Sequence, residues 1–338
     1  MSASGTALVT GANGFIGSAL VRKLIEKGYA VRSLVLKGTS EAFLEGIDTE
    51  IVYGDITNPS SLKPAFRGTD IAFHLAAMAR DWGPKWLFRK LNYEGVLNVL
   101  DVAERADVSR LLHVSTLGVH TYNPVFGGDE SVPRDSTLNY YCLYKRLGEE
   151  EVRKRIEKNR IPITIVRPGV FPFGPRDTTS FYPLAQALEK GIFQFINGGR
   201  ARICVAYVEN LVDGIVTAAE RPEGAGETFI ICDDEPHSWR NIMFTFCDQL
   251  GVKRPKFSIP AGTLYPIAAL LMGLWKAFNL PGEPPLTFYR IRVSSVDLYF
   301  TNEKARRVLN WKPQVPFDEA VRRTVEWYRH VKNRIHRR

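Results

Sequence analysis

"TALVTGANGFIGSALVRKL", residues 6–24, decides the fold of this chain. Its glycines Gly11, Gly14 and Gly17 follow the order G-x-x-G-x-x-G. The apolar run 7–9 before them is typical of a strand buried on both faces, and helical spacing of apolar residues follows up to Gly28, a suitable C-cap. The glycines therefore lie on a strand-to-helix turn, where a backbone without Cβ atoms can approach a pyrophosphate at the helix N-terminus. We expect a dinucleotide site here.

Composition predicts a globular chain with a large core and a smaller lobe: 338 residues, 45% hydrophobic and 24% charged. No signal peptide precedes the first predicted strand, which favours a cytoplasmic protein. The four cysteines show no C-x-x-C or Cys/His metal spacing, so we expect reduced core residues and no metal site.

The net charge of +9 is concentrated in the tail 321–338, which has seven Lys/Arg against one Glu. Such a tail is either a solvated helix end or a contact for an anionic surface. Because no aromatic stacking motif accompanies it, we expect no nucleic-acid partner.

Strand and helix patterns alternate over the first half of the chain. Short apolar strands are predicted at 31–35, 51–53, 71–75, 111–115 and 163–166, and helices at 92–105 and 140–158. This alternation predicts an α/β fold: a Rossmann-type, doubly wound parallel sheet over 1–170. Residues 171–338 are predicted to be mainly a smaller substrate-binding lobe, with some segments returning to the Rossmann domain.

The stretch "YYCLYKRLGEE" places Tyr141 and Lys145 four apart, on one face of a predicted helix. A neighbouring ammonium stabilises a phenolate, so we expect a lowered pKa for Tyr141 and a general acid or base for a carbonyl/alcohol pair. Tyr140 and Tyr144 have no lysine partner at this spacing. Upstream, a predicted strand ends in Ser115-Thr116, where a hydroxyl can bond the same substrate oxygen.

Together these pieces resemble the extended short-chain dehydrogenase/reductase family over nearly the whole chain. The matching motifs occur in order: "TGANGFIG" (10–17), "GDI" (54–56), "HLAA" (74–77), "LNYEGVLNVL" (91–100), "VST" (114–116), Tyr141-x-x-x-Lys145, "RPGVFPFGPRD" (167–177), "YVENLVDGI" (207–215) and "LNWKPQVPFDEAVRRTVEWY" (309–328).

The resemblance implies a catalytic set of Thr116, Tyr141 and Lys145. Counting back from Val119 selects Thr116 as the hydroxyl, with Ser115 as the alternative. It implies that Asp55 binds the adenine amino group and that Asn92 braces the active site. The full implied cofactor site is Gly11, Asn13, Gly14, Phe15, Ile16, Gly17, Lys37, Asp55, Ile56, Leu75, Ala76, Ala77, Asn92, Tyr141, Lys145, Pro168 and Val170.

Within the family, the chain is similar to the 3β-hydroxysteroid and sterol-4α-carboxylate 3-dehydrogenase branch. The segments that carry this likeness are "AAMARDWG", "VSTLGVH", "GETFIICDDEPHSW" (226–239) and "PPLTFYRIRVSSVDLYFTNEKARRVL" (284–309). It implies an NAD(P)-dependent oxidoreductase acting on a hydrophobic, sterol-like secondary alcohol or ketone. Two alternatives are a nucleotide-sugar epimerase or dehydratase, with Arg176, Arg200 and Arg202 as diphosphate partners, and a catalytically silent NAD(P)-binding protein.

The cofactor is predicted to be NAD, with NADP as the alternative. Many NAD-binding relatives place an acid at the end of the second strand, where it takes the ribose hydroxyls. This chain has Val35, Leu36 and Lys37 there, and Lys37 or Ser40 could accept a 2′-phosphate. No acid is present to repel one.

The stretch 264–280 is apolar but too short to span a bilayer, which takes about 20 apolar residues. It is either a buried core helix or a helix lying on a membrane surface, with Trp275 and Lys276 at the interface. In the second case Leu271 and Trp275 would be partly exposed. The sequence leaves the oligomeric state open, a homodimer being one option, and peripheral membrane contact is the other expected association.

Overall fold

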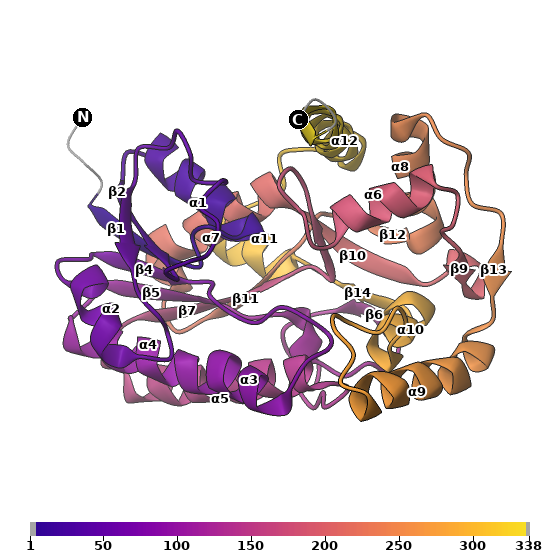
Figure 1. The fold of residues 1–338 in the computed structure, drawn as a ribbon. Helices are drawn as coiled ribbons and strands as arrows, with labels where there is room; N and C mark the ends of the chain where they lie inside the picture. Colours follow the sequence, from indigo (N-terminus) through magenta and orange to yellow (C-terminus); the bar gives the residue numbers. More distant parts are fainter. Residues whose placement is uncertain (1–4, 336–338) are drawn as a thin grey trace.

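The structure, a computed structural model, describes residues 5–335, with side chains up to residue 332. Its larger part is a seven-stranded sheet in which every strand pairs in parallel with its neighbours (Figure 1). In spatial order the strands are β11 (Thr228–Ile231), β7 (Ile163–Pro168), β5 (Arg110–Val114), β4 (Ile71–His74), β1 (Thr6–Thr10), β2 (Ala30–Val35) and β3 (Glu50–Tyr53).

The strand order places a topological switch point between β1 and β4. From β1 the chain adds β2 and β3 on one side, then crosses to the other side to form β4, β5, β7 and β11. In open α/β sheets, ligands bind outside the carboxyl ends of the strands at such a point. The turn after β1 and the loop after β4 therefore border the expected cofactor site.

Helices cover both faces of this sheet, as the doubly wound prediction requires (Figure 1). On one face, ion pairs join α1 to α7: Lys23 Nζ lies 3.0 Å from Asp213 Oδ1, and Lys27 Nζ lies 2.5 Å from Glu220 Oε2. This face carries α1 (Phe15–Glu26), α7 (Val208–Glu220) and α11 (Glu303–Leu309). The other carries α2 (Pro59–Phe66), α4 (Gly95–Arg105) and α5 (Tyr140–Lys158), with α3 (Lys85–Arg89) and a π-helical turn η1 (Lys90–Glu94) leading into α4.

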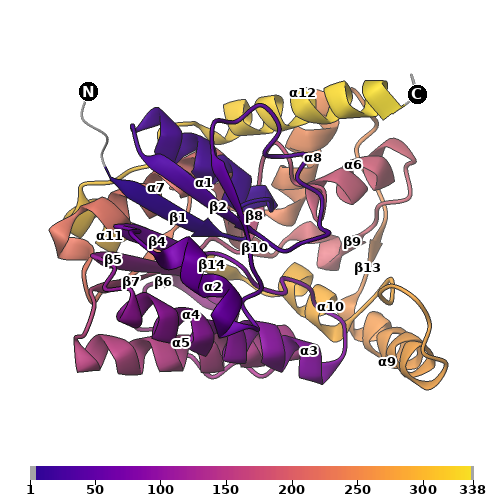
Figure 2. The same cartoon turned by 60° about the vertical axis from the view of Figure 1, so that its left-hand side comes forward.

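The second part of the molecule lies beside the carboxyl edge of the large sheet (Figures 1 and 2). It is built on a sheet of β12 (Pro236–Ser238), β10 (Arg202–Tyr207), β14 (Leu298–Phe300) and β6 (Val125–Gly128), with β8 (Phe171–Phe173) beside β10. Its helices are α6 (Phe181–Glu189), α8 (Trp239–Leu250), α9 (Ala261–Ala277), α10 (Phe288–Ser295) and α12 (Phe317–Ile335). The short pair β9 (Phe195–Ile196) and β13 (Ser258–Ile259) and the 3₁₀ turn η3 (Asn197–Gly199) complete it. Two further 3₁₀ turns, η2 (Leu117–Val119) after β5 and η4 (Pro222–Gly224) after α7, pack against helices of the large sheet.

The five strands predicted after the first are present within one or two residues of their expected ends. Four of them form where apolar side chains are buried from both faces; β7, for example, is buried at every position, whereas the edge strand β3 is mostly exposed. Gly28 follows the last turn of α1 with φ 87°, the left-handed conformation expected of a residue just past a helix end. All four cysteines are buried and free.

The described part of the basic tail belongs to α12, and three of its charges are paired within the molecule. Arg322 and Arg323 both pair with Glu319, and Lys332 pairs with Glu189. The side chains of Arg334, Arg337 and Arg338 lie outside the described part of the chain. In both ribbon views α12 and α9 lie at opposite edges of the molecule, so the basic tail and the apolar stretch do not share a face (Figures 1 and 2).

Candidate active site

The turn after β1 leaves an open cradle at the N-terminus of α1. Gly11 has φ 69°, and a Cβ there would lie 3.0 Å from the backbone N and Cα of Ala76. Gly17 faces the turn itself, because its Cβ would lie 2.1 Å from Gly11 O. Gly14 is exposed and is the N-cap residue of α1. No described side chain forms a capping hydrogen bond at this end of the helix. Phe15 and Ile16 form the first turn of α1, so their amides lie at this open end.

Asn13 connects the cradle to the loop after β2. Its Nδ2 donates to Thr39 Oγ1 and to Ser40 O, both at 2.9 Å. Asn13 therefore braces the loop that carries Lys37. The Lys37 side chain is exposed and makes no ion pair within the described residues.

The end of β4 is held against β1 by Thr10. Its Oγ1 accepts from the amides of Leu75 and Ala76, each at 3.1 Å, and lies 2.9 Å from His74 Nδ1. Because two amides already donate to this oxygen, the Thr10 hydroxyl donates its own proton to His74 Nδ1. Burial lowers the pKa of His74 to about 3, which keeps the ring neutral. Leu75 and Ala76 thus lie beside Gly11, and the exposed Ala77 follows them.

Asn92 braces the next loop. It is buried in η1, where its Oδ1 accepts from Met78 N at 2.8 Å and its Nδ2 donates to Met78 O at 3.1 Å. Asp55 follows β3 and accepts from Thr57 N at 2.8 Å. Ile56 beside it is buried.

The two adjacent hydroxyls after β5 have different partners. Ser115 is buried and donates to Glu149 Oε2 at 2.6 Å. Thr116 accepts from Gly118 N at 3.0 Å, and its hydroxyl lies close enough to that of Tyr141 to stabilise the phenolate by hydrogen bonding. Of the two hydroxyls, Thr116 is therefore the one at the phenol.

Tyr141 differs from its neighbours in position. Tyr140 is 44% exposed and Tyr144 is buried, whereas Tyr141 is partly buried with its hydroxyl at Thr116. The expected fall in its pKa is wrong for the chain alone: burial raises the pKa of Tyr141 to about 12, against the opposing effect of the Thr116 hydrogen bond. Desolvation of the phenolate outweighs that bond.

Lys145, rather than Tyr141, is the residue of this pair whose pKa is lowered. Its Nζ is buried and donates to Val114 O at 2.8 Å. Burial lowers the pKa of Lys145 to about 8, although the Glu149 carboxylate acts in the opposite direction. Lys145 is thus held behind the phenol by the end of β5.

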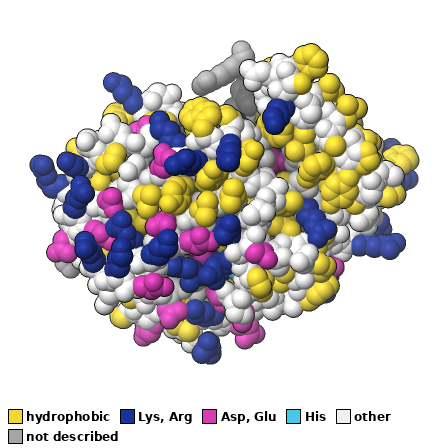
Figure 3. All heavy atoms as spheres, turned by 90° about the horizontal axis from the view of Figure 1, so that it is seen from below, with side chains coloured by type: hydrophobic (Ala, Val, Ile, Leu, Met, Phe, Trp, Pro, Cys, Tyr) yellow, Lys and Arg dark blue, Asp and Glu magenta, His cyan; other side chains and the backbone are white. Residues whose placement is uncertain are grey.

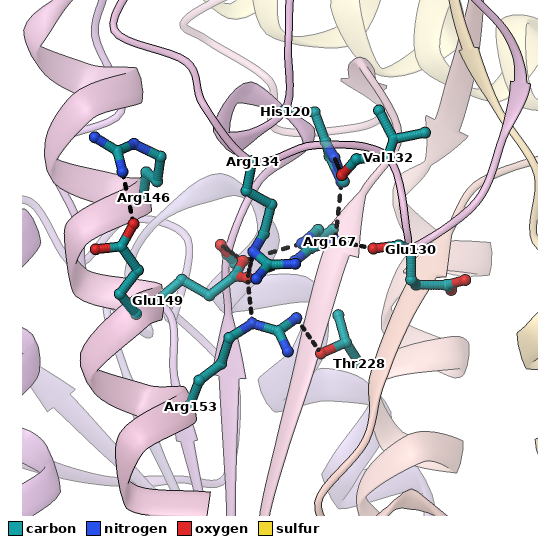
Figure 4. A network of polar contacts seen from close by, with 11 residues as sticks. His120, Glu130, Val132, Arg134, Arg146, Glu149, Arg153, Arg167 and Thr228 are labelled. Atoms are coloured by element: carbon teal, nitrogen blue, oxygen red, sulfur yellow. Dashed lines mark hydrogen bonds and ion pairs between the residues drawn. The ribbon is translucent and has the colours of Figure 1, made fainter.

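One turn further along α5, Glu149 is the centre of a buried charge network (Figure 4). Its two oxygens accept from Nε and Nη2 on one edge of the Arg167 guanidinium, and Arg153 Nε donates to Glu149 Oε1 at 3.2 Å. Arg167 also donates to His120 Nε2 at 2.9 Å. These hydrogen bonds hold the pKa of Glu149 at about 2 despite its burial. The network fixes α5 to β5 and β7 close to Lys145.

A pocket begins at Thr116 and extends into the second part of the molecule. The side chains that line it are uncharged, and most are apolar or aromatic: Thr116, Leu117, Gly118, Thr121, Tyr122, Val170, Tyr289, Leu298 and Phe300. The rings of Tyr122 and Tyr289 meet edge to face, 5.8 Å apart. The predicted cofactor residue Val170 therefore also lines the pocket. Pro168, two residues earlier in the chain, is the last residue of β7.

Sequence reasoning missed several of these residues. Glu149 carries a visible signal, because it follows Tyr141 and Lys145 at the same helical spacing. Tyr122, Tyr289 and Phe300 carry none, since they reach the pocket from three separate elements. Conversely, Arg176, Arg200 and Arg202 are not among the residues that line it, and Arg202 lies over the ring of Tyr299. Within residues 5–335 there is no group of three metal-binding side chains.

The residues present fit a dinucleotide. An exposed glycine at an uncapped helix N-terminus is a site for a pyrophosphate, and the predicted cofactor residues lie at the carboxyl ends of β1 to β4 and β7, or on helices that pack there. Gly11, Gly14 and the first turn of α1 would hold the phosphates. Lys145 and Tyr141 would lie at the other end, toward the pocket.

Comparison with known proteins agrees with this site. Residues 7–232 match the NAD dependent epimerase/dehydratase family. The chain belongs to this family. The predicted membership of the extended short-chain dehydrogenase/reductases is thereby confirmed, and the family description supports the NAD prediction.

Two relatives and one solved structure show how far the similarity extends. The mouse (Mus musculus) sterol-4-alpha-carboxylate 3-dehydrogenase, decarboxylating, is 30% identical over 96% of this chain and 91% of its own. The 2-alkyl-3-oxoalkanoate reductase of Stenotrophomonas maltophilia (strain K279a) is 29% identical over 94% and 97%. The crystal structure of gox2253 superposes with a TM-score of 0.82 and 29% identity, over 97% of this chain and 99% of that one.

Proposed function

We propose that this protein is an NAD-dependent oxidoreductase that interconverts a secondary alcohol and a ketone on a hydrophobic, sterol-like substrate with a 3β-hydroxyl. The observation that carries the proposal is that the side chains around the Thr116 hydroxyl, which line a small pocket there, are uncharged and mostly apolar. Such a lining favours an apolar molecule with one polar group, which the Thr116–Tyr141 pair can bind.

The chain's own residues supply the proton chemistry. Thr116 orients the substrate oxygen. Because burial raises the pKa of Tyr141 to about 12, its phenol is protonated in the free chain and donates that proton to the oxygen of a ketone as it is reduced. In the reverse direction the Tyr141 phenolate, stabilised by Thr116, takes the alcohol proton. Lys145, held by Val114 O, lies one helical turn away and would bind the ribose next to the nicotinamide. When bound, NAD supplies the hydride acceptor. A carboxylate beside the alcohol carbon would leave a β-keto acid, which loses carbon dioxide without another catalytic group.

The rival functions fit these contacts less well. A sugar nucleotide needs cationic partners for its diphosphate, and the pocket lining contains none. A catalytically silent NAD-binding protein would not require a tyrosine, a threonine and a buried lysine arranged around one point.

A substrate screen tests the proposal. The purified protein is assayed for reduction of NAD and NADP with 3β-hydroxysterols, other hydrophobic secondary alcohols and sugar nucleotides. We expect turnover with NAD and the hydrophobic alcohols. Epimerisation of a sugar nucleotide without net NADH formation would overturn the assignment.

The first prediction concerns Tyr141. Tyr141→Phe removes the proton acceptor, and since general acid–base groups contribute about 10²–10⁴-fold, we expect kcat to fall within that range while NAD binding stays unchanged. Tyr140→Phe is the matched control, because that ring is exposed one residue away. Equal losses of kcat in the two variants would contradict the assignment.

A further inference from the structure

Helix α9 lies on the surface rather than in a core. Of its 17 residues only Ala261, Leu264 and Ala268 are buried. The expectation of a buried core helix for this stretch is therefore wrong, and Leu271 and Trp275 are partly exposed as the surface alternative required.

The most exposed large side chains of α9 are not Leu271 and Trp275, which the sequence analysis named, but lie along a different line on the helix. Ile267, Leu270, Leu274 and Phe278 recur at spacings of three and four, so they share one side of the helix and its end, with Leu270 63% and Phe278 70% exposed. We call these four the α9 apolar face. Figure 3 shows hydrophobic side chains gathered over the end of the molecule at which Figure 1 places α9. Exposed apolar clusters of this kind mark contact surfaces.

Along the chain, the segment that contains this face carries charge of a single sign. Between Asp248 and Glu283 the chain contains no acidic residue but four basic ones, Lys253, Arg254, Lys256 and Lys276. Arg254 pairs with Asp248, whereas the three lysines are exposed and form no ion pair in the described part of the chain. An apolar helix flanked by unpaired lysines complements an anionic lipid surface. Two copies of the same face would instead bring like charges together.

The length of the helix defines how it can meet lipid. Seventeen residues are too few for a span, and no helix within residues 5–335 is long and apolar enough to cross a bilayer. The helix would therefore lie in the plane of the surface, with its apolar face below the headgroups.

The same helix leads to the candidate active site. Tyr265 of α9 packs against Phe288 of α10, with ring centroids 5.9 Å apart, and Leu264 and Ala268 share a small core with Ile291. The next residue of α10, Tyr289, lines the pocket at Thr116. Only one helix thus separates the apolar face from the pocket.

We propose that the α9 apolar face docks on an anionic lipid bilayer, so that a hydrophobic substrate passes from the lipid phase to the pocket beneath α10. The docking rests on the face itself, while the passage of substrate rests on the function proposed above.

Vesicle binding tests the docking without any turnover. The full chain is co-sedimented with phosphatidylcholine vesicles that contain about 30% phosphatidylserine, which supplies the negative charge. Vesicles of phosphatidylcholine alone are the neutral comparison. The test variant is Leu270→Glu with Leu274→Glu. Phe126→Glu is the matched control, because Phe126 on β6 is 65% exposed, as Leu270 is, and lies outside α9.

We expect the parent to bind the anionic vesicles more tightly than the neutral ones. The double variant should lose about tenfold or more in vesicle affinity, since both leucines would no longer be buried in lipid, and Phe126→Glu should lose none. The melting temperature of the double variant should stay close to that of the parent, because Leu270 and Leu274 are both exposed.

Three results would overturn the docking: no vesicle binding by the parent, equal binding by the double variant, or a parent dimer that this variant dissociates. The last would assign the face to a second copy. Vesicle binding as expected, together with no oxidation of any hydrophobic alcohol, would leave the docking in place and reject the function proposed above.

Discussion

At the scale of single residues, the glycines of the β1–α1 turn have different roles. Gly17 is a packing glycine, because any Cβ would overlap Gly11 O at 2.1 Å. Gly14 faces outward, and its Cβ would meet only Gly11 O, at 3.2 Å. A side chain at Gly14 would therefore extend into the space that a pyrophosphate needs, without disturbing the core.

The second prediction follows from this difference. Gly14→Val should remove NAD binding and leave the unfolding free energy of the free protein within about 1 kcal/mol of the parent. Gly17→Ala should lower that free energy by roughly 1–3 kcal/mol, the usual cost of overpacking. Thermal melting with and without NAD measures both effects. A Gly14→Val protein that NAD stabilises as much as the parent would reject the phosphate site.

The third prediction separates the two hydroxyls after β5. Thr116→Ala should lower kcat, since it removes the donor to Tyr141, and leave stability nearly unchanged. Ser115→Ala should mainly cost stability, about 1 kcal/mol, because it removes one donor to the buried Glu149 carboxylate. Turnover and urea unfolding of both variants measure the two effects. The opposite pattern would make Ser115 the catalytic hydroxyl.

At the scale of elements, the sequence predicted the strands and the helix face that depend on the local pattern of residues. The apolar runs located β2 to β5 and β7, and the Tyr141/Lys145 spacing located the reactive face of α5. It did not predict that β11 completes the sheet, because about 60 residues, many of them in the second part of the molecule, separate it from β7. Nor did it predict the direction of the Tyr141 pKa, which depends on three-dimensional burial that spacing along a helix does not contain.

Helix α5 carries the fourth prediction, through the buried ammonium of Lys145. Its pKa is about 8 in the folded chain against a usual 10.5, so between these values the unfolded chain binds more protons and stability rises with pH. From pH 7.5 to 9.5 this one group should add roughly 2 kcal/mol to the free energy of unfolding.

Lys145→Met should remove that increment. Urea unfolding at the two pH values is the measurement, with Lys158→Met, an exposed lysine at the end of the same helix, as the control. An unchanged pH dependence in Lys145→Met would mean that Lys145 keeps its ordinary pKa.

At the scale of the whole molecule, the two parts are joined across the pocket by a polar clamp. Asp81, in the loop after β4, accepts from Thr287 Oγ1 at 2.6 Å and from Arg290 Nη2 at 2.9 Å. Glu283 adds a second carboxylate, 2.6 Å from the same nitrogen. The clamp holds the start of α10, and with it Tyr289, against the loop that Asn92 braces.

The last prediction concerns this clamp. Asp81→Asn weakens the ion pair with Arg290 and the bond from Thr287, so we expect faster amide hydrogen exchange over residues 283–295, by about tenfold, as for a local loss of roughly 1–2 kcal/mol. NAD binding should be unchanged, because Asp81 lies away from the β1–α1 turn. Asp248→Asn is the control, since its pair with Arg254 is about half exposed and such pairs contribute little. If exchange in 283–295 were the same in both variants, α10 would be held by its apolar contacts with α9 alone, and the position of Tyr289 in the pocket would not depend on the clamp.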